Sequence, residues 1–98
     1  MVAKKKTKCS DIQRNAILGL EFLKFDVLDS DRARNLRQKK LQEATFMGNV
    51  EEKKVCIEFL SKSGCYTVST TLWACTNDWV VFKENQRIPV KSIRKVEL

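Results

Sequence analysis

The C-terminal half of the chain alternates apolar and polar residues from residue 53 to residue 98, with short polar turns between the runs. Successive side chains of an extended strand point to opposite faces, so this alternation is typical of strands with one buried face. Val55, Ile57 and Phe59 form the first such face, and Ser61-Lys62-Ser63-Gly64 follows as a turn. The pattern predicts an antiparallel β-meander of roughly four to five strands.

The later strands follow from the next turns. A long second strand is expected from Cys65 to Cys75, because this run is rich in β-branched and aromatic residues. Thr76-Asn77-Asp78 then predicts a turn, and Trp79–Lys83 a third strand. Pro89 has no N–H to donate to a ladder, so it marks the edge or bend of a strand.

The second hairpin is apolar on both faces, which is typical of strands that lie between two layers. Leu72 and Ala74 are expected to continue the core face. The helical part of the chain is expected to cover Trp73 and Phe82 on the other face. Trp79 is the aromatic ring expected to be partly open to solvent, since it begins a strand beside a polar turn.

The cysteine spacing predicts neither a metal site nor a disulfide. The separations are 47, 9 and 10 residues, so there is no C-x-x-C pair, and the chain has no histidine. If Leu60 faces Cys65 across the first turn, Cys56 faces Ser69, and a Cys56–Cys65 bridge would need a different turn. The alternative is a disulfide formed in an oxidising compartment. We expect four reduced, metal-free thiols and no cofactor: Cys9, Cys56, Cys65 and Cys75.

The lack of histidine also argues against an enzyme. It removes Ser–His and Cys–His nucleophile pairs and the commonest general base near neutral pH. None of the 12 acidic residues lies with a companion in an apolar run that would predict a shifted pKa. We therefore expect a non-enzymatic binding module with no small-molecule substrate.

Residues 12–28 predict a first helix, with Ser10-Asp11 before it as the N-cap. The competing interpretation is extended strand through residues 20–22 and 25–27. One apolar stripe has helical spacing and suits docking on the meander. Its members are Ile12, Ala16, Leu20, Leu23 and Val27.

A second stripe on the same predicted helix consists of Leu18, Phe22 and Phe25. A small domain cannot cover both stripes of one helix, and monomers avoid large exposed apolar patches. Association about a twofold axis is the commonest way to bury such a patch. We therefore expect a homo-oligomer, most simply a dimer, with these three residues at its interface.

Asp29-Ser30-Asp31 predicts the start of a second helix, from Asp31 to about Phe46, and Gly48-Asn49 its end. The expected organisation is a basic disordered tail over residues 1–9 and a single domain over residues 10–98. Within that domain, residues 10–48 form the helical part and residues 49–98 the β-meander. The fold class is α+β, with an N-terminal helix or helix pair packed on the meander.

The order of helix, strand, glycine turn, long strand and short strands resembles SH3-like small β-barrels. In layout it is most similar to the Sm-like RNA-binding proteins of the host-factor type. The resemblance covers about residues 31–98 and implies that the meander can close as a small barrel. The turn Ser63-Gly64 departs from the Asp-Gly or Asn-Gly turn of those proteins, and no RNA-site residue carries over.

A second resemblance rests on two short stretches of the meander. The strand Thr70-Thr71-Leu72-Trp73-Ala74-Cys75-Thr76, followed by Ile88-Pro89-Val90, is similar to small uncharacterised bacterial proteins. That resemblance implies no activity, so the functional expectation depends on the charge of the chain instead.

The net charge of +7 is unevenly placed along the chain. Residues 1–47 carry 11 Lys+Arg against 6 Asp+Glu, and residues 48–98 carry 8 against 6. This asymmetry favours a polyanionic partner such as nucleic acid, although a positive charge can equally serve solubility. Because the cations spread around the second helix, we expect phosphate contacts with little sequence preference. The candidate nucleic-acid-binding residues are Lys4, Lys5, Lys6, Lys8, Arg32, Arg34, Arg37, Lys39, Lys40, Lys91, Arg94 and Lys95.

The longest apolar stretch, from Ala16 to Leu28, is interrupted by charged residues and is too short to span a membrane. The chain begins Met-Val-Ala-Lys-Lys-Lys and continues with polar residues, without the apolar run of a secretory signal. These two features predict a cytoplasmic protein that has no membrane partner.

Overall fold

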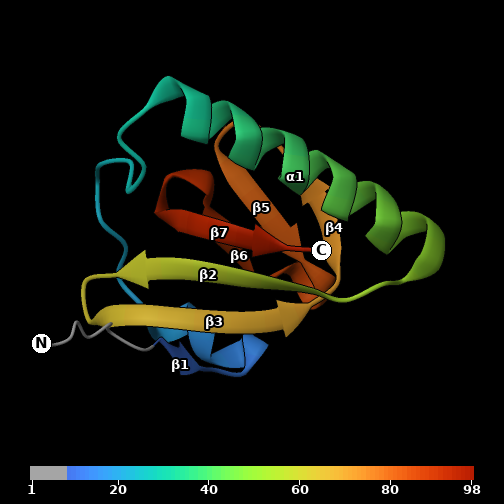
Figure 1. Ribbon diagram of the computed structural model, residues 1–98. Coiled ribbons are helices and arrows are strands. Elements are labelled where there is room, and N and C mark those ends of the chain that lie inside the picture. The colour runs from blue at the N-terminus through green and yellow to red at the C-terminus, as the bar shows by residue number, and fades with distance from the viewer. Residues whose placement is uncertain (1–8) are drawn as a thin grey trace, which may run out of the picture.

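A computed structural model of the protein describes residues 9–98. The fold is α+β, with helix α1 (Asp31–Glu51) packed on two sheets of mostly antiparallel strands (Figure 1). One sheet has the order β1-β3-β2-β7, and the other has the order β4-β5-β6. The strands are β1 (Ser10–Asp11), β2 (Val55–Ser61), β3 (Gly64–Thr70), β4 (Leu72–Cys75), β5 (Trp79–Phe82), β6 (Arg87–Pro89) and β7 (Ile93–Glu97).

Three short 3₁₀ helices complete the described elements: η1 (Arg14–Gly19), η2 (Lys83–Asn85) and η3 (Val90–Ser92). Helix α1 contacts β4 and β7, whereas η1 contacts β3, so the two helical segments lie at opposite ends of the molecule (Figure 1). None of the helices in residues 9–98 has both the length and the apolar character to cross a membrane.

The first hairpin has the register expected from its turn. Leu60 pairs with Cys65 and Cys56 with Ser69, so these predictions are confirmed. Val55, Ile57 and Phe59 of β2 are buried, while the residues between them are half-buried. Gly64 has a φ of 141°, which residues with a Cβ rarely adopt, and this explains the glycine in the turn.

The long strand expected from Cys65 to Cys75 is in fact two strands in different sheets. The chain changes sheet at Thr71, whose carbonyl accepts a hydrogen bond of 3.0 Å from the Lys83 N–H. A register shift between Leu72 and Ala74 then exchanges the faces of β4, so Ala74 is exposed and Cys75 packs against the core. Alternation alone could not reveal this bulge, because an extra residue reverses the pattern beyond it.

The second hairpin therefore departs in part from the expected layering. Phe82 is buried as expected, but it lies in the same core cluster as Leu72 and Val80 and not on an opposite face covered by helices. Trp73 is 43% exposed, so the prediction that helices cover it is wrong. Strand β6 ends at Pro89 and forms an edge of its sheet, which confirms the position expected for this proline.

The last strand returns to the first strand of the meander. Strand β7 pairs antiparallel with β2, with Val96 opposite Ile57. The two sheets nevertheless stay separate throughout residues 9–98 and do not close into a barrel. The α+β architecture is thus confirmed, whereas the closed form that the SH3-like resemblance allowed is not present.

The predicted helix over residues 12–28 is wrong. Ser10–Asp11 forms a short strand parallel to β3, and only Arg14–Gly19 is helical, as one 3₁₀ segment. The segment that follows bonds through its backbone to the turn of the first hairpin and to η3, which are both distant in the sequence. Lys62 N–H donates to Glu21 O at 2.8 Å, and Val27 N–H donates to Lys91 O at 2.9 Å.

Apolar residues between positions 12 and 28 still reach the core, but from the 3₁₀ helix η1 and the non-helical chain on either side of it. Ile17, which belongs to neither predicted stripe, is 2% exposed and is the segment's fully buried anchor. Ile12, Leu20 and Phe22 pack partly buried against the same core. A chain that wraps around a sheet without forming a long helix can bury these residues as well as a helix does. Their helical spacing was therefore not evidence for an α-helix.

Helix α1 begins where its cap predicts. The Ser30 hydroxyl accepts a hydrogen bond from Ala33 N–H at 3.1 Å, which satisfies one of the free N–H groups at the helix start. The helix passes through Gly48 and ends at Glu51, with Glu52 in the left-handed conformation as its cap. Gly48 therefore does not end the helix as predicted. A glycine is needed there for close packing on β4, because a Cβ would collide with the backbone oxygen of Leu72.

We predict that Gly48→Ala destabilises the protein by roughly 1–3 kcal/mol, the usual cost of overpacking a close contact. Alanine favours a helix over glycine by about 1 kcal/mol, so a net loss means that the clash with β4 outweighs helix propensity. Urea unfolding followed by circular dichroism measures the change. Gly19→Ala is the control, since nothing lies within 4 Å of its added Cβ, and equal midpoints for the two variants would contradict the prediction.

Candidate nucleic-acid interface

A groove of about 140 Å³ lies between α1 and β7 and collects cations that are far apart in the sequence. Helix α1 contributes Arg37 and Lys40, and β7 contributes Arg94 and Lys95. The described residues that line it include no acidic side chain. The remaining lining residues are apolar: Leu28, Ala33, Leu36 and Val96.

Arg37 is committed to the interior of the protein. Its side chain is 6% exposed, and its guanidinium donates to both carboxylate oxygens of Asp26, at 2.8 and 2.7 Å. The same Nη1 donates to Ile93 O at 3.0 Å. The hydrogen bond from Arg37 holds the pKa of Asp26 below its ordinary value, although partial burial of the carboxyl opposes this. Arg37 therefore contributes little free charge to the groove.

Arg34 is also used within the fold. Its Nε donates to Leu28 O at 2.9 Å and lies 3.6 Å from the Asp26 carboxylate. Its Nη1 lies 3.5 Å from the Asp31 carboxylate. Arg34 and Arg37 thus fasten the residues before α1 to the helix, and both are poorly placed to bind an external anion.

The remaining predicted cations lie at the surface. Arg94 pairs with Glu58 at 2.6 Å, and Lys95 pairs with Glu97 at 3.2 Å. Lys40 is half-buried in the groove wall. Within residues 9–98, four of the predicted cations make no ion pair: Arg32, Lys39, Lys40 and Lys91. Lys4, Lys5, Lys6 and Lys8 lie outside the described residues, as does the tail expected there up to residue 8.

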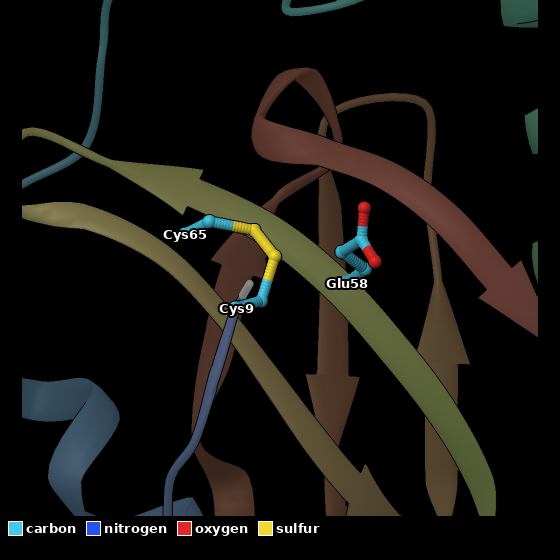
Figure 2. Close-up of side chains that lie close together, drawn as sticks. All are labelled: Cys9, Glu58 and Cys65. Atoms are coloured by element: carbon cyan, nitrogen blue, oxygen red, sulfur yellow. A yellow bond between two sulfur atoms is a disulfide. The ribbon is translucent and has the colours of Figure 1, made fainter. Parts of the chain in front are cut away.

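Cys9 and Cys65 form a disulfide, which overturns the expectation of four reduced cysteines (Figure 2). Their Cα atoms are 4.7 Å apart, within the range that a disulfide spans. Glu58 of β2 lies beside the two sulfurs in Figure 2. The bridge closes a long loop, with a sequence separation of 56 between its cysteines, and in the chain-entropy treatment such a loop is worth about 4 kcal/mol.

Sequence reasoning missed this pair because it depends on an unpredicted parallel strand. The bridge lies one residue before Ser10, which pairs with Tyr66, so the register of β1 brings Cys9 beside Cys65. The register of the first hairpin argued against a Cys56–Cys65 bridge, and Cys56 is indeed a free thiol. Cys75 is free as well, and burial raises its pKa against the opposing hydrogen bond from Gln38.

A second, polar hollow of about 470 Å³ lies on the side of the molecule that carries β1 and η1. Arg14 at its wall pairs with Glu84 at 2.9 Å and donates to the Thr70 hydroxyl at 3.1 Å. The Glu84 carboxylate thus balances the charge of Arg14, the only arginine among the described residues of the wall. Among residues 9–98, those predicted to bind nucleic acid do not line this hollow.

Two tryptophans are partly open to solvent. Trp79 is 40% exposed, in line with the expectation for it, and the Arg87 guanidinium carbon lies 5.0 Å from its ring centroid. This cation–π contact already occupies Arg87. Trp73 on β4 is exposed to a similar extent, and Asn49 of α1 donates to its backbone oxygen at 3.4 Å.

The three residues expected at an oligomer interface do not form one stripe, because no single helix carries them: Leu18 lies in η1, and Phe22 and Phe25 lie in the non-helical chain after it. Leu18 is 77% exposed and Phe25 is 63% exposed. Phe22 instead packs partly buried against the core, with its ring 6.1 Å from that of Phe59. Helix α1 also carries exposed apolar side chains that were not predicted as a surface: Leu36, Phe46 and Val50.

No protein-family model, curated protein or solved structure matches this chain.

We predict that Asp26→Asn destabilises the protein by about 3 kcal/mol at neutral pH, because it leaves the buried Arg37 charge without its counter-ion. Asp29→Asn is the matched control, since Asp29 is an exposed carboxylate three residues away, and it should change stability by no more than about 0.5 kcal/mol. Chemical unfolding of the two variants and the wild type gives the comparison. Equal losses from both substitutions would contradict the role assigned to Asp26.

The same pair sets a pH dependence with a definite sign. The folded pKa of Asp26 lies below its ordinary value of 3.8, so unfolding takes up a proton and acid favours the unfolded chain. The stability that the wild type gains over Asp26→Asn should be fully present above that ordinary value. It should shrink as the pH falls through the lowered folded pKa. An advantage that stays constant into acid would show that the carboxylate charge is not its source.

Proposed function

We propose that the protein is a non-enzymatic module that binds nucleic acid through its phosphates. The observation that carries this proposal is the groove where Lys40 of α1 meets Arg94 and Lys95 of β7, without an acidic side chain in its described lining. Arg32 and Lys39 of α1, and Lys91 of η3 just before β7, add exposed positive charge. A surface of this kind attracts a phosphate backbone by charge.

The proposed binding is tolerant of sequence. Cations on a helix and a strand can follow a backbone, whereas reading bases needs side chains that converge on base edges in a groove of the duplex. The exposed Trp79 ring offers stacking area for an unpaired base. Because Arg87 already lies over that ring, we assign the main share of affinity to phosphate contacts.

The structure changes which residues should be replaced to test binding. The sequence alone would select Arg34, Arg37 and Lys40, but the two arginines hold Asp26, so their loss would damage the fold. We choose Lys39→Gln, Lys40→Gln and Lys95→Gln together. The control replaces Lys53, Lys62 and Lys83, three exposed lysines outside the groove lining, by glutamine and removes the same charge.

We predict that the groove variant binds two unrelated oligonucleotides more weakly by a similar factor. The slope of log K against log salt should flatten by about 0.9 per lost phosphate contact on duplex and about 0.7 on single strands. Fluorescence anisotropy over a series of salt concentrations measures both quantities. The control variant should keep a salt slope closer to that of the wild type. No binding at low salt, equal losses from both variants, or strong preference for one oligonucleotide would contradict the proposal.

A second candidate is self-assembly, which the exposed Leu18 and Phe25 favour. We predict that the wild type sediments as a dimer and that Leu18→Glu with Phe25→Glu gives a folded monomer. Phe22 is left unchanged because it packs against Phe59. Phe46→Glu with Val50→Glu is the control on α1. A monomeric wild type, or a dimer abolished only by the control pair, would contradict this candidate.

We propose the cytoplasm as the compartment, which suits the two free cysteines Cys56 and Cys75. Disulfides of cytosolic proteins in most organisms are transient and serve catalysis or redox sensing. The Cys9–Cys65 bridge would then meet a pool of reducing thiols, and its chemistry becomes a question of its own.

A further inference from the structure

The Cys9–Cys65 disulfide lies against a cation instead of an apolar wall. Arg94 Nη2 is 3.2 Å from Cys65 Sγ and 3.4 Å from Cys9 Sγ. The same guanidinium donates from Nε to Glu58 Oε2 at 2.6 Å. Figure 2 shows Glu58 projecting from β2 next to the bridge that joins Cys9 to Cys65. Glu58 thus holds Arg94 in a position where a second N–H group faces both sulfurs.

The environment of this disulfide differs from that of an inert structural disulfide in its exposure and in the charge beside it. Both cysteines are only partly buried, so a small thiol can approach them. A nearby guanidinium favours the thiolate over the thiol, and a sulfur that is more stable as a thiolate leaves faster in exchange. The Glu58 carboxylate opposes a thiolate by its charge, but it lies on the Nε side of Arg94, which itself donates directly to the sulfurs.

We propose that Cys9–Cys65 is a redox-active site that exchanges with low-molecular-weight thiols, and that Arg94 stabilises the sulfur that leaves. The inference rests on the geometry of the bridge and does not require the proposed function. It adds a reactive site to a chain whose sequence offers no C-x-x-C pair.

The exchange proceeds in two balanced steps. The thiolate of the first small thiol attacks one sulfur of the bridge, and the S–S bond breaks. Its electron pair stays on the other sulfur, which is Cys9 or Cys65 and in either case faces Arg94. A second small thiolate then attacks the small-thiol sulfur of the mixed disulfide. The S–S bond to the cysteine breaks, its electron pair stays on the cysteine sulfur, and the two small thiols leave as one small-molecule disulfide. Two thiols have been oxidised, two electrons have reduced the bridge, and their two protons balance the two cysteine thiols formed.

Reduction also has a local structural consequence. Strand β1 is held on β3 by the pairs Ser10–Tyr66 and Asp11–Thr67 and by the Ile12 N–H bond to Thr67 O. The disulfide is the covalent tie immediately before these contacts. Once it is reduced, the start of the described chain is held by this short ladder, the Asp11–Thr67 side-chain bond and the packing of Ile12, and chain ends with few such contacts open locally.

The test compares the rates at which oxidised full-length proteins are reduced by glutathione. Samples are quenched with acid, alkylated and weighed intact by mass spectrometry. Arg94→Gln should slow reduction by roughly threefold, for about one unit of thiol pKa and a Brønsted dependence of about 0.5. Arg94→Lys, which keeps the charge, should fall between that variant and the wild type. Arg87→Gln, which removes another exposed arginine, should react like the wild type.

A further comparison separates the chemistry from a general loosening of the fold. In urea, the wild type and Arg94→Gln should be reduced at the same rate, because Arg94 is no longer held beside the sulfurs. A rate for folded Arg94→Gln that equals or exceeds that of the wild type would overturn the role of Arg94. Four alkylated cysteines in protein that has never met a reductant would overturn the site itself.

Discussion

One largely buried ion pair joins three parts of the chain that are far apart in the sequence or belong to different elements. Arg37 belongs to α1, Asp26 to the extended segment before it, and the Ile93 carbonyl to the start of β7. A guanidinium with a side chain 6% exposed is stable only when its donors find partners, because burial of an unpaired charge is costly. The Asp26 carboxylate is itself oriented by a 2.9 Å hydrogen bond from Leu28 N–H. The position of α1 over β7, and hence the groove between them, depends on this arrangement.

The part of the fold that could be predicted is the part determined by near neighbours. The pairing of β2 with β3 follows from alternation and one glycine turn, and the start of α1 follows from the Ser30 cap. The segment over residues 12–28 could not be predicted in this way. Its path is set by backbone bonds to Lys62 and Lys91, which are distant in the sequence. Apolar residues spaced every three or four positions fit a helix and an extended wrapping chain equally well.

In the candidate site, too, the residue types could be predicted from the sequence, whereas the long-range contacts could not. Charge composition identifies the cations of α1 and β7, but it cannot tell which of them are already neutralised. That Arg37 serves the fold depends on Asp26, eleven residues earlier, and on the carbonyl of Ile93, far along the chain. The disulfide was not predicted for a related reason. The spacing of the cysteines does not reveal the parallel pairing of β1 with β3 that brings Cys9 beside Cys65. Local sequence supplied the candidate residues, and long-range contacts decided their roles.

The shortness of β1 has a consequence for how the molecule meets its neighbours. Strand β1 pairs with two residues of β3, Tyr66 and Thr67, although β3 runs over seven residues. Beyond that cover, β3 presents the outer edge of its sheet, and an open edge offers backbone donors and acceptors to any other extended chain. Natural proteins guard such edges with short strands and charges, and here Asp11 supplies a carboxylate that bonds the Thr67 hydroxyl. By covering part of this edge, the two-residue strand β1 limits pairing of β3 with a strand of another molecule. The Cys9–Cys65 disulfide holds β1 in that position.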